Sequence, residues 1–282
     1  MQLEAALAAE IPRNIRAALD EDIGRGDLTA QLIAERTPGH ARVITRQPMV
    51  LCGTQWFEGC FYALDTNCGI RWELRDGEAA QPNQILCEIS GNARAMLTAE
   101  RPALNFLQLL SATATETRRY VEAVQGTRAR IMDTRKTLPG LRLAQKYAVK
   151  VGGGHNQRIG LFDGILIKEN HIVAAGGIRQ ALKEAFRIAA GQVTVQIEVE
   201  NLDQLREALE AQAMLILLDN FDLDGMRAAV RLNAGRAQLE ASGGVNLETV
   251  RAIAETGVDR ISIGGLTKDI KAVDLSMRFM AS

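Results

Sequence analysis

The second half of the chain repeats one pattern that leaves few folds open: a short apolar run, a polar loop and an amphipathic segment. Six apolar runs fit buried strands, at residues 129–133, 164–168, 193–200, 214–219, 238–242 and 260–264. Amphipathic segments at residues 178–190, 202–211 and 247–256 fit helices between them. This alternation predicts a parallel sheet, either doubly wound or closed into a barrel.

The N-terminal third has a different pattern. Strand-like runs at residues 41–46, 70–74 and 85–89, with a helical segment at residues 56–64, predict a small, mostly antiparallel sheet. Two short helices are expected before residue 35, around a turn at residues 20–29. Asp27 or Thr29 is the candidate N-cap of the second helix.

A long helical segment joins the two patterns. It is expected to start at Thr98 and to end near Val124, which places Pro102 in the first turn, where proline is tolerated. Glu100 and Arg101 lie in that same turn, and from the residues alone they can be an ordinary solvated pair.

Composition narrows the class of protein. With 47% hydrophobic and 24% charged residues, the 282-residue chain is globular, and its net charge of −1 disfavours nucleic-acid binding. No signal peptide or membrane-spanning run is evident. The cysteines lack metal-binding spacing and are expected to be reduced thiols in a cytoplasmic protein; they are Cys52, Cys60, Cys68 and Cys87.

Positive charge is concentrated in one stretch. Between Arg135 and His171 two acids, Asp163 and Glu169, stand against seven basic residues: Arg135, Lys136, Arg142, Lys146, Lys150, Arg158 and Lys168. Because the whole chain is nearly neutral, this excess points to a small anionic ligand. Arg135, Lys136 and Lys168 also follow predicted strands, at the end where barrel enzymes carry their chemistry.

Two other predicted strands, at residues 193–200 and 214–219, end in residues with carboxylate side chains. Glu198 and Glu200 share a strand face, and Asp219 ends an apolar run. Carboxylates are poor core residues, so a shared ligand or metal site is favoured. Capping of a helix from Phe221 onward by Asp219 remains an alternative.

Two glycine motifs follow the last two predicted strands. Backbone amides at Ser242, Gly243 and Gly244 and at Gly264 and Gly265 can cradle a phosphate, although glycine also serves tight turns. The run at residues 152–154 can simply end a helix after Val151. Nucleotide-binding glycine signatures and a Ser-His-Asp or Cys-His grouping are absent, and histidine metal ligation is improbable.

Three motifs carry a resemblance to a known family. They are the run from Asp133 to Arg142, the glycines 152–154 followed by Asn156 and Arg158, and the run from Leu166 to His171. Together they resemble the quinolinate phosphoribosyltransferases. The resemblance favours the barrel, of phosphoribosyltransferase type II, with seven strands, one of which stays unplaced. It implies an N-terminal α+β open sandwich at residues 1–112, the barrel at 113–272, and a C-terminal segment at 273–282 that returns to the sandwich.

The resemblance also implies the reaction: phosphoribosyl transfer from phosphoribosyl pyrophosphate to quinolinate with decarboxylation, giving nicotinate mononucleotide, pyrophosphate and CO₂ for NAD biosynthesis. Catalytic roles are implied for Lys136, Lys168, Glu198 and Asp219. The implied substrate-binding residues are Arg101, Arg135, Lys136, Gln157, Arg158, Lys168, His171, Glu198, Asp219, Ser242, Gly243, Gly244, Gly264 and Gly265. Mg²⁺ is expected on phosphoribosyl pyrophosphate, held indirectly by Glu198 and Asp219. The expected assembly is a homodimer, possibly larger, with Arg101 reaching the neighbouring subunit's site.

One position departs from the family. Gln157 stands where many members have histidine, so an amide replaces an imidazole and no proton can be taken up there. Three rival interpretations remain: a pyrophosphorylase-like protein of molybdenum transport, a catalytically inactive barrel that senses a dicarboxylate, and a nicotinate phosphoribosyltransferase. The intact cationic motifs favour the quinolinate enzyme.

Overall fold

The computed structural model describes residues 3–280, apart from the side chain of Glu4, and divides into two compact units. Of the described residues, the first unit contains 3–118, 138–153 and 269–280, and the second contains 119–137 and 154–268. The chain therefore returns twice to the first unit. Residues 138–153 cluster there, although the sequence analysis places them in the barrel, and residues 281–282 of the expected C-terminal segment lie outside the described part.

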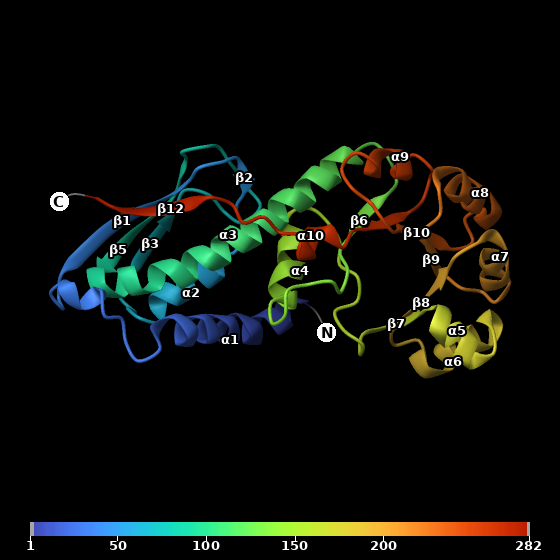
Figure 1. Cartoon of the computed structure of the whole chain (residues 1–282), viewed down its shortest axis with the longest axis horizontal. Coiled ribbons are helices and arrows are strands. Elements are labelled where there is room, and N and C mark those ends of the chain that lie inside the picture. The colour runs from blue at the N-terminus through green and yellow to red at the C-terminus, as the bar shows by residue number, and fades with distance from the viewer. Residues whose placement is uncertain (1–2, 281–282) are drawn as a thin grey trace. The chain divides into compact units, whose positions relative to one another are not determined.

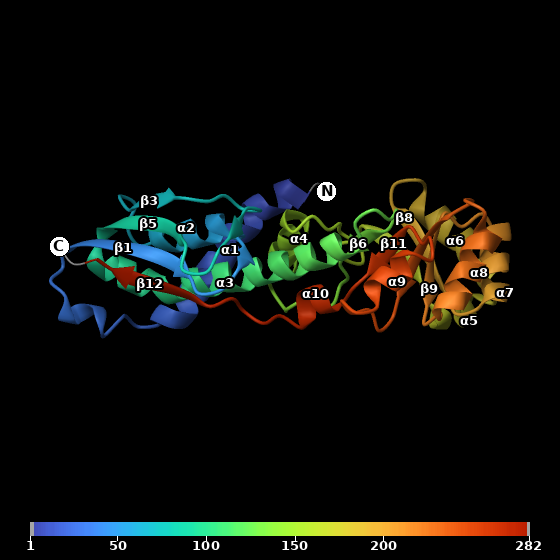
Figure 2. The same cartoon turned by 90° about the horizontal axis from the view of Figure 1, so that it is seen from above.

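The first unit is built on an antiparallel sheet with strand order β12-β1-β5-β3. Figure 2 shows the C-terminal strand β12 beside β1. The sheet strands are β1 (Pro38–Thr45), β3 (Gly69–Trp72), β5 (Ile85–Asn92) and β12 (Leu275–Phe279), and β2 (Met49–Val50) pairs separately with β4 (Ala79–Ala80). The helices are α1 (Leu3–Ile23), the 3₁₀ turn η1 (Ala30–Leu32), α2 (Thr54–Tyr62), most of α3 (Ala93–Ala123) and α4 (Arg142–Val151).

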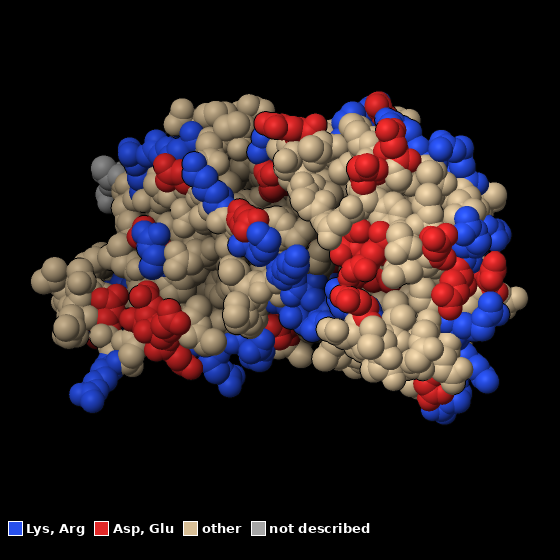
Figure 3. Space-filling view, turned by 45° about the vertical axis from the view of Figure 1, so that its right-hand side comes forward, with Lys and Arg blue, Asp and Glu red and all other residues tan. Residues whose placement is uncertain are grey.

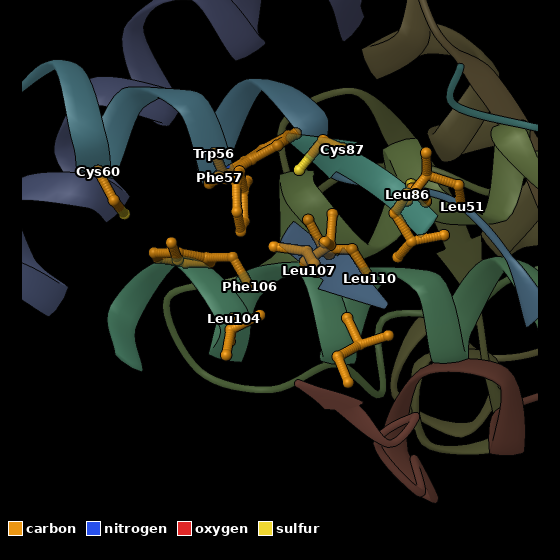
Figure 4. Close-up of a cluster of buried hydrophobic side chains, with 14 of the residues drawn as sticks. Leu51, Trp56, Phe57, Cys60, Leu86, Cys87, Leu104, Phe106, Leu107 and Leu110 are labelled. Carbon is orange, nitrogen blue, oxygen red and sulfur yellow. The ribbon is translucent and has the colours of Figure 1, made fainter. Parts of the chain in front are cut away.

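The core of this unit lies between α2, α3 and the sheet. Figure 4 shows Phe57 of α2 pointing toward α3, which carries Leu107, and labels Trp56 of α2 and Leu86 and Cys87 of β5 in the same cluster. All five side chains are fully buried. The buried apolar residues at helical intervals along α3, such as Leu104, Leu107 and Leu110, therefore supply much of the packing surface of this unit.

The second unit contains six parallel strands in the order β6-β11-β10-β9-β8-β7, with helices on the outside (Figure 1). The strands are β6 (Arg130–Met132), β7 (Gly164–Ile167), β8 (Thr194–Val199), β9 (Leu215–Asp219), β10 (Gln238–Ser242) and β11 (Arg260–Ser262). The helices are α5 (Glu169–Ala175), α6 (Ile178–Ala189), α7 (Leu202–Glu210), α8 (Leu223–Asn233), α9 (Val250–Ala254) and α10 (Gly265–Lys268). The strand order matches the α/β barrel, and all six predicted strands are confirmed.

The seventh strand position is filled by a single residue. His155 forms a parallel bridge with Met132, donating its backbone N–H to Ile131 O at 2.8 Å and accepting from Asp133 N at 3.0 Å. It pairs with the edge of β6 that β11 leaves open. The bridge cannot extend toward Val151, because α4 ends there and glycines 152–154 follow, as the helix-stop alternative predicts.

Two helix predictions were wrong. The N-terminal segment forms one 21-residue helix, because Leu7, Ile15 and Leu19 are buried at helical spacing along it. Only the 3₁₀ turn η1 follows, where Asp27 accepts a hydrogen bond from Ala30 N at 2.9 Å. Helix α3 begins at residue 93, so Pro102 lies inside it. Burial of residues such as Met96 and Ala99 offsets the hydrogen bond that proline cannot donate.

No helix within residues 3–280 is both long enough and apolar enough to cross a lipid bilayer. Charges of both signs share the face seen in Figure 3, as expected for a nearly neutral chain.

Candidate active site

The predicted site residues of the second unit gather at the carboxyl ends of its parallel strands. Each strand has at least one of them at or near its carboxyl end: Arg135 and Lys136 after β6, Lys168 after β7, Glu198 next to the last residue of β8, Asp219 and Ser242 at the ends of β9 and β10, and Gly264 after β11. Parallel strands bring these ends to one edge of the sheet, which is the catalytic end of α/β barrels.

Lys168, Glu198 and Asp219 form an electrostatic group at this edge. Lys168 Nζ lies 2.8 Å from Glu198 Oε2. Burial, and then the nearby Glu198, raise the pKa of Asp219, whereas Lys168 and Lys136 act in the opposite direction. A raised carboxyl pKa means that the negative charge is unfavourable here, so a cation arriving at this group would be stabilised.

Lys136 is positioned by the turn after β11. Thr267 Oγ1 donates a hydrogen bond to Lys136 O at 2.7 Å, and Thr134 Oγ1 accepts one from Lys136 N at 3.0 Å. A Cβ atom added to Gly264 would lie 3.0 Å from Lys136 Cδ, so the lysine stem passes directly over this glycine. The absence of a side chain at Gly264 thus leaves space for Lys136.

The buried carboxylate of Asp133 organises the loop that carries Arg158. Asp133 is fully buried and accepts hydrogen bonds from Asn156 Nδ2 at 2.6 Å and from Gln157 N at 2.8 Å. Arg158 Nη1 donates to Gly164 O at 3.0 Å. Burial, and then the neighbouring Arg135 guanidinium, lower the pKa of Arg158, partly offset by Asp163. The positive charges of these two arginines favour an anionic ligand near Arg158.

Gln157 makes a contact that the sequence analysis missed. Its Nε2 lies 2.5 Å from both carboxylate oxygens of Glu240, a residue of β10 that is 1% exposed. Gln196 Nε2 donates to the same carboxylate at 3.1 Å, and Arg260 Nε lies 3.1 Å away. The available signal was weak: Gln196 and Glu240 are polar residues inside strands, each with apolar residues on both sides in the sequence.

Strand register explains why these groups meet. Neighbouring strands pair Glu198 with Leu217, Leu217 with Glu240, Glu240 with Arg260, and Arg260 with Arg130. Partners in register project from the same face of a sheet. One row of side chains on this face therefore runs from Glu198, at the carboxyl ends, to Arg130, at the amino ends.

The capping alternative for Asp219 was wrong, because Asp222 is the N-cap of α8 and accepts a hydrogen bond from Gly225 N at 2.7 Å. The glycines after β10 do adopt a backbone that favours glycine, with φ of 100° at Gly243 and 61° at Gly244. Asp219 thus stays available to a ligand, and these glycines form a tight turn.

The other predicted residues divide between the units. His171 Nδ1 accepts a hydrogen bond from Lys168 N at 3.0 Å at the start of α5, a structural contact beside its predicted ligand role. Arg101 is exposed on α3, in the first unit. The cationic stretch is likewise divided, because its members on α4 belong to the first unit: Arg142, Lys146 and Lys150.

Among the described residues, no group of three or more His, Cys, Asp or Glu side chains is arranged to hold a metal ion. Glu198 and Asp219 alone offer too few ligands for a resident site. They are suited to a cation that arrives with its own oxygen ligands, such as Mg²⁺ on a pyrophosphate.

Comparison with known proteins agrees with this geometry. Residues 27–111 match the family model "Quinolinate phosphoribosyl transferase, N-terminal domain", and residues 113–278 match the model of the C-terminal domain. The chain belongs to the quinolinate phosphoribosyltransferase family. The resemblance inferred from the motifs at Asp133, Asn156 and Lys168 is thereby confirmed.

Relatives within this family match almost end to end. The probable nicotinate-nucleotide pyrophosphorylase [carboxylating] of Bacillus subtilis is 42% identical over 257 residues, covering 91% of this chain and 89% of its own. The Mycobacterium leprae enzyme of that name is 41% identical, with 93% and 95% covered. The solved structure from Francisella tularensis has a TM-score of 0.94 and 46% identity, with 96% of each chain covered. The fold class is therefore that of the family.

Proposed function

We propose that this chain transfers phosphoribosyl from phosphoribosyl pyrophosphate to quinolinate and releases CO₂, giving nicotinate mononucleotide and pyrophosphate in NAD biosynthesis. The observation that carries the proposal is the convergence of Lys136, Lys168, Glu198 and Asp219 at the carboxyl end of the barrel. These residues lie within a chain that matches the family over both of its domains.

The cations are assigned to quinolinate, which carries two adjacent carboxylates. The positive charge of Arg135 lowers the pKa of Arg158, so an anion that binds near both guanidiniums would be favourable. A guanidinium can hold a carboxylate in two parallel hydrogen bonds and so orient the pyridine ring toward the ribose. When the substrate binds, Lys168 would leave its ion pair with Glu198 and pair with a carboxylate of quinolinate instead.

The carboxylates are assigned to the ribose and its leaving group. Glu198 and Asp219 would accept hydrogen bonds from ribose hydroxyls and stabilise positive charge that develops at C1 as pyrophosphate departs. Mg²⁺ bound to phosphoribosyl pyrophosphate would approach the same pair. The turns at Ser242–Gly244 and Gly264–Gly265 would offer backbone N–H groups to the 5-phosphate.

Decarboxylation follows from the product of transfer. The ring nitrogen becomes cationic once it bonds to ribose, so the electron pair left by departing CO₂ is stabilised in the ring. Lys136, held by Thr267 over Gly264, would position the 2-carboxylate together with Lys168. A proton from water then completes the nicotinate ring.

We further propose a homodimer, in which Arg101 acts in the neighbouring subunit's site, and a cytoplasmic location. The location is supported by four unpaired, buried cysteines, as expected in a reducing compartment. Sharing of Arg101 is tested by mixing Arg101→Ala and Arg135→Ala chains, because hybrid dimers should regain one complete site. Verified heterodimers without recovered activity would exclude the sharing.

The reaction is tested by incubating the chain with quinolinate, phosphoribosyl pyrophosphate and Mg²⁺ and measuring nicotinate mononucleotide, with nicotinate replacing quinolinate in a parallel arm. Product from quinolinate alone is expected. Product from nicotinate alone would reassign the acceptor. Binding of both substrates without product would favour the dicarboxylate sensor.

The residue assignments are tested separately by alanine substitution at Arg135, Arg158 and Lys168. A charge-assisted hydrogen bond contributes about 1.5–3 kcal/mol, so quinolinate affinity should fall by about tenfold or more at each position. The matched control is Arg206→Ala on α7, where Arg206 pairs with Asp203 on the helix surface. A loss below about 1 kcal/mol at Arg135, Arg158 or Lys168 would contradict its assignment.

A further inference from the structure

A cavity rich in arginine lies along β6, with its arginines at the amino ends of the barrel strands. It has a volume of about 560 Å³ and is lined by residues including Arg128, Arg130, Met132, Gln238, Asp259 and Arg260. Arg130, Gln238 and Arg260 are the first residues of β6, β10 and β11. The arginines of the cavity therefore lie at the amino ends of the strands, whereas Met132, His155 and Asn156 line it near the carboxyl end of β6.

The arginines of this cavity outnumber the carboxylates available to them. Arg128 forms an ion pair with Asp259, and Arg260 lies beside Glu240. Within residues 3–280, the guanidinium of Arg130 forms no hydrogen bond or ion pair with another side chain. One positive charge at the cavity thus lacks a counter-charge from the protein.

Strand register makes the excess charge costly. Arg130 and Arg260 are in-register partners on adjacent strands, so their side chains leave the same face next to each other. Like charges at facing positions destabilise a sheet. In addition, Arg260 Nε is buried and makes no hydrogen bond within the described residues, although Glu240 Oε2 lies 3.1 Å away. The buried Nε–H donor of Arg260 therefore lies next to Arg130, whose positive charge is not neutralised by a carboxylate, and together they favour the binding of an anion.

We propose that this cavity binds a small anion through a phosphate group, with Arg130 and Arg260 as its principal ligands and Arg128 at its rim. A phosphate offers several acceptor oxygens to guanidinium groups that approach from two strands. The volume also has room for a larger group attached to the phosphate, so the ligand is either inorganic phosphate or a nucleoside monophosphate. This site is separate from the phosphate position proposed at the carboxyl ends.

The test is isothermal titration of the full chain, in phosphate-free buffer of low ionic strength, with inorganic phosphate in one arm and adenosine monophosphate in the other. The test variant is Arg130→Gln, which keeps a polar side chain at an exposed position and breaks no ion pair. Arg206→Gln is the matched control, because Arg206 is an exposed arginine on the outside of the barrel. Arg130→Lys retains the charge without the planar fork.

Wild type and Arg206→Gln should share a binding event that Arg130→Gln weakens by about tenfold or more, with Arg130→Lys intermediate. Any binding at the carboxyl ends should persist in all four proteins. The arm that gives the tighter Arg130-dependent event identifies the ligand as phosphate or nucleotide. Isotherms that coincide for wild type and Arg130→Gln in both arms, or no binding by wild type in either, would overturn the proposal.

Discussion

Replacing Glu240 by glutamine should destabilise the barrel while leaving its packing volume almost unchanged. The carboxylate is 1% exposed and serves three partners: Gln157 at 2.5 Å, Gln196 at 3.1 Å and Arg260 at 3.1 Å. In Glu240→Gln, the NH₂ group of the new amide would face the NH₂ groups of Gln157 and Gln196, which are also hydrogen-bond donors. Arg260 would in addition lose its counter-charge.

The magnitude follows from the burial of the group. Removing one partner of a buried ion pair costs about 3–5 kcal/mol, because the remaining charge stays desolvated. The side chain of Arg260 is 14% exposed at the edge of the cavity, so water can partly solvate it. We therefore expect a loss at the lower end, about 3 kcal/mol. With a urea m value of about 3 kcal/mol/M, the unfolding midpoint would fall by about 1 M.

Urea unfolding followed by circular dichroism at 222 nm measures this change, since both tryptophans, Trp56 and Trp72, lie in the first unit. The control is Glu255→Gln. Glu255 is 54% exposed and pairs with Arg251 one helical turn away, an interaction contributing about 0.3–0.5 kcal/mol. If Glu240→Gln unfolds at the same urea concentration as the control, the buried carboxylate does not stabilise the barrel as argued.

Three further results are expected. Asp219→Asn should raise the melting temperature at pH 7, because burial raises the pKa of Asp219 and so disfavours its ionised form. The gain should vanish as the pH falls below 3.8, the ordinary pKa of aspartate, because the wild-type carboxyl is then protonated in both the folded and the unfolded state. A gain that did not change with pH would contradict burial of the charge as its cause. Gly264→Ala should displace the Lys136 side chain and lower kcat by up to about 10²-fold, with little change in melting temperature. If the variant kept the kcat of the wild type, Lys136 would not need the space above Gly264. Burial raises the thiol pKa of Cys60 to about 12 and of Cys68 to about 11, so a disulfide reagent at pH 8 should modify them only after unfolding.

The barrel strands could be predicted from sequence because each is a buried apolar run bounded by polar residues. The runs at residues 238–242 and 164–168 agree with β10 and β7 to within one residue. Parallel pairing then places the residues that end these strands at one edge, so Lys168, Glu198 and Asp219 could be grouped without coordinates. Their grouping depends only on strand direction, which a regular strand and helix alternation determines.

Other features depend on long-range contacts. The one-residue bridge at His155 carries no periodic signal, since two backbone hydrogen bonds to β6 define it. The start of α3 ahead of Pro102 depends on burial of Met96 in the first unit, which outweighs the local preference of proline. The passage of Lys136 over Gly264 likewise joins residues far apart in the chain. Local sequence patterns do not show which residues far apart in the chain come into contact.

The partner of Gln157 fits the presence of an amide at the position where the family resemblance led us to expect a histidine. Its amide donates to both oxygens of Glu240 while remaining uncharged, and Arg260 already supplies the positive charge beside that carboxylate. At this position the same carboxylate would raise the pKa of a histidine side chain. The charge of the barrel interior would then depend on pH. Glutamine holds the loop that carries Arg158 through an amide that does not itself titrate. The amide therefore fits a structural role beneath the active site better than the role of an acid.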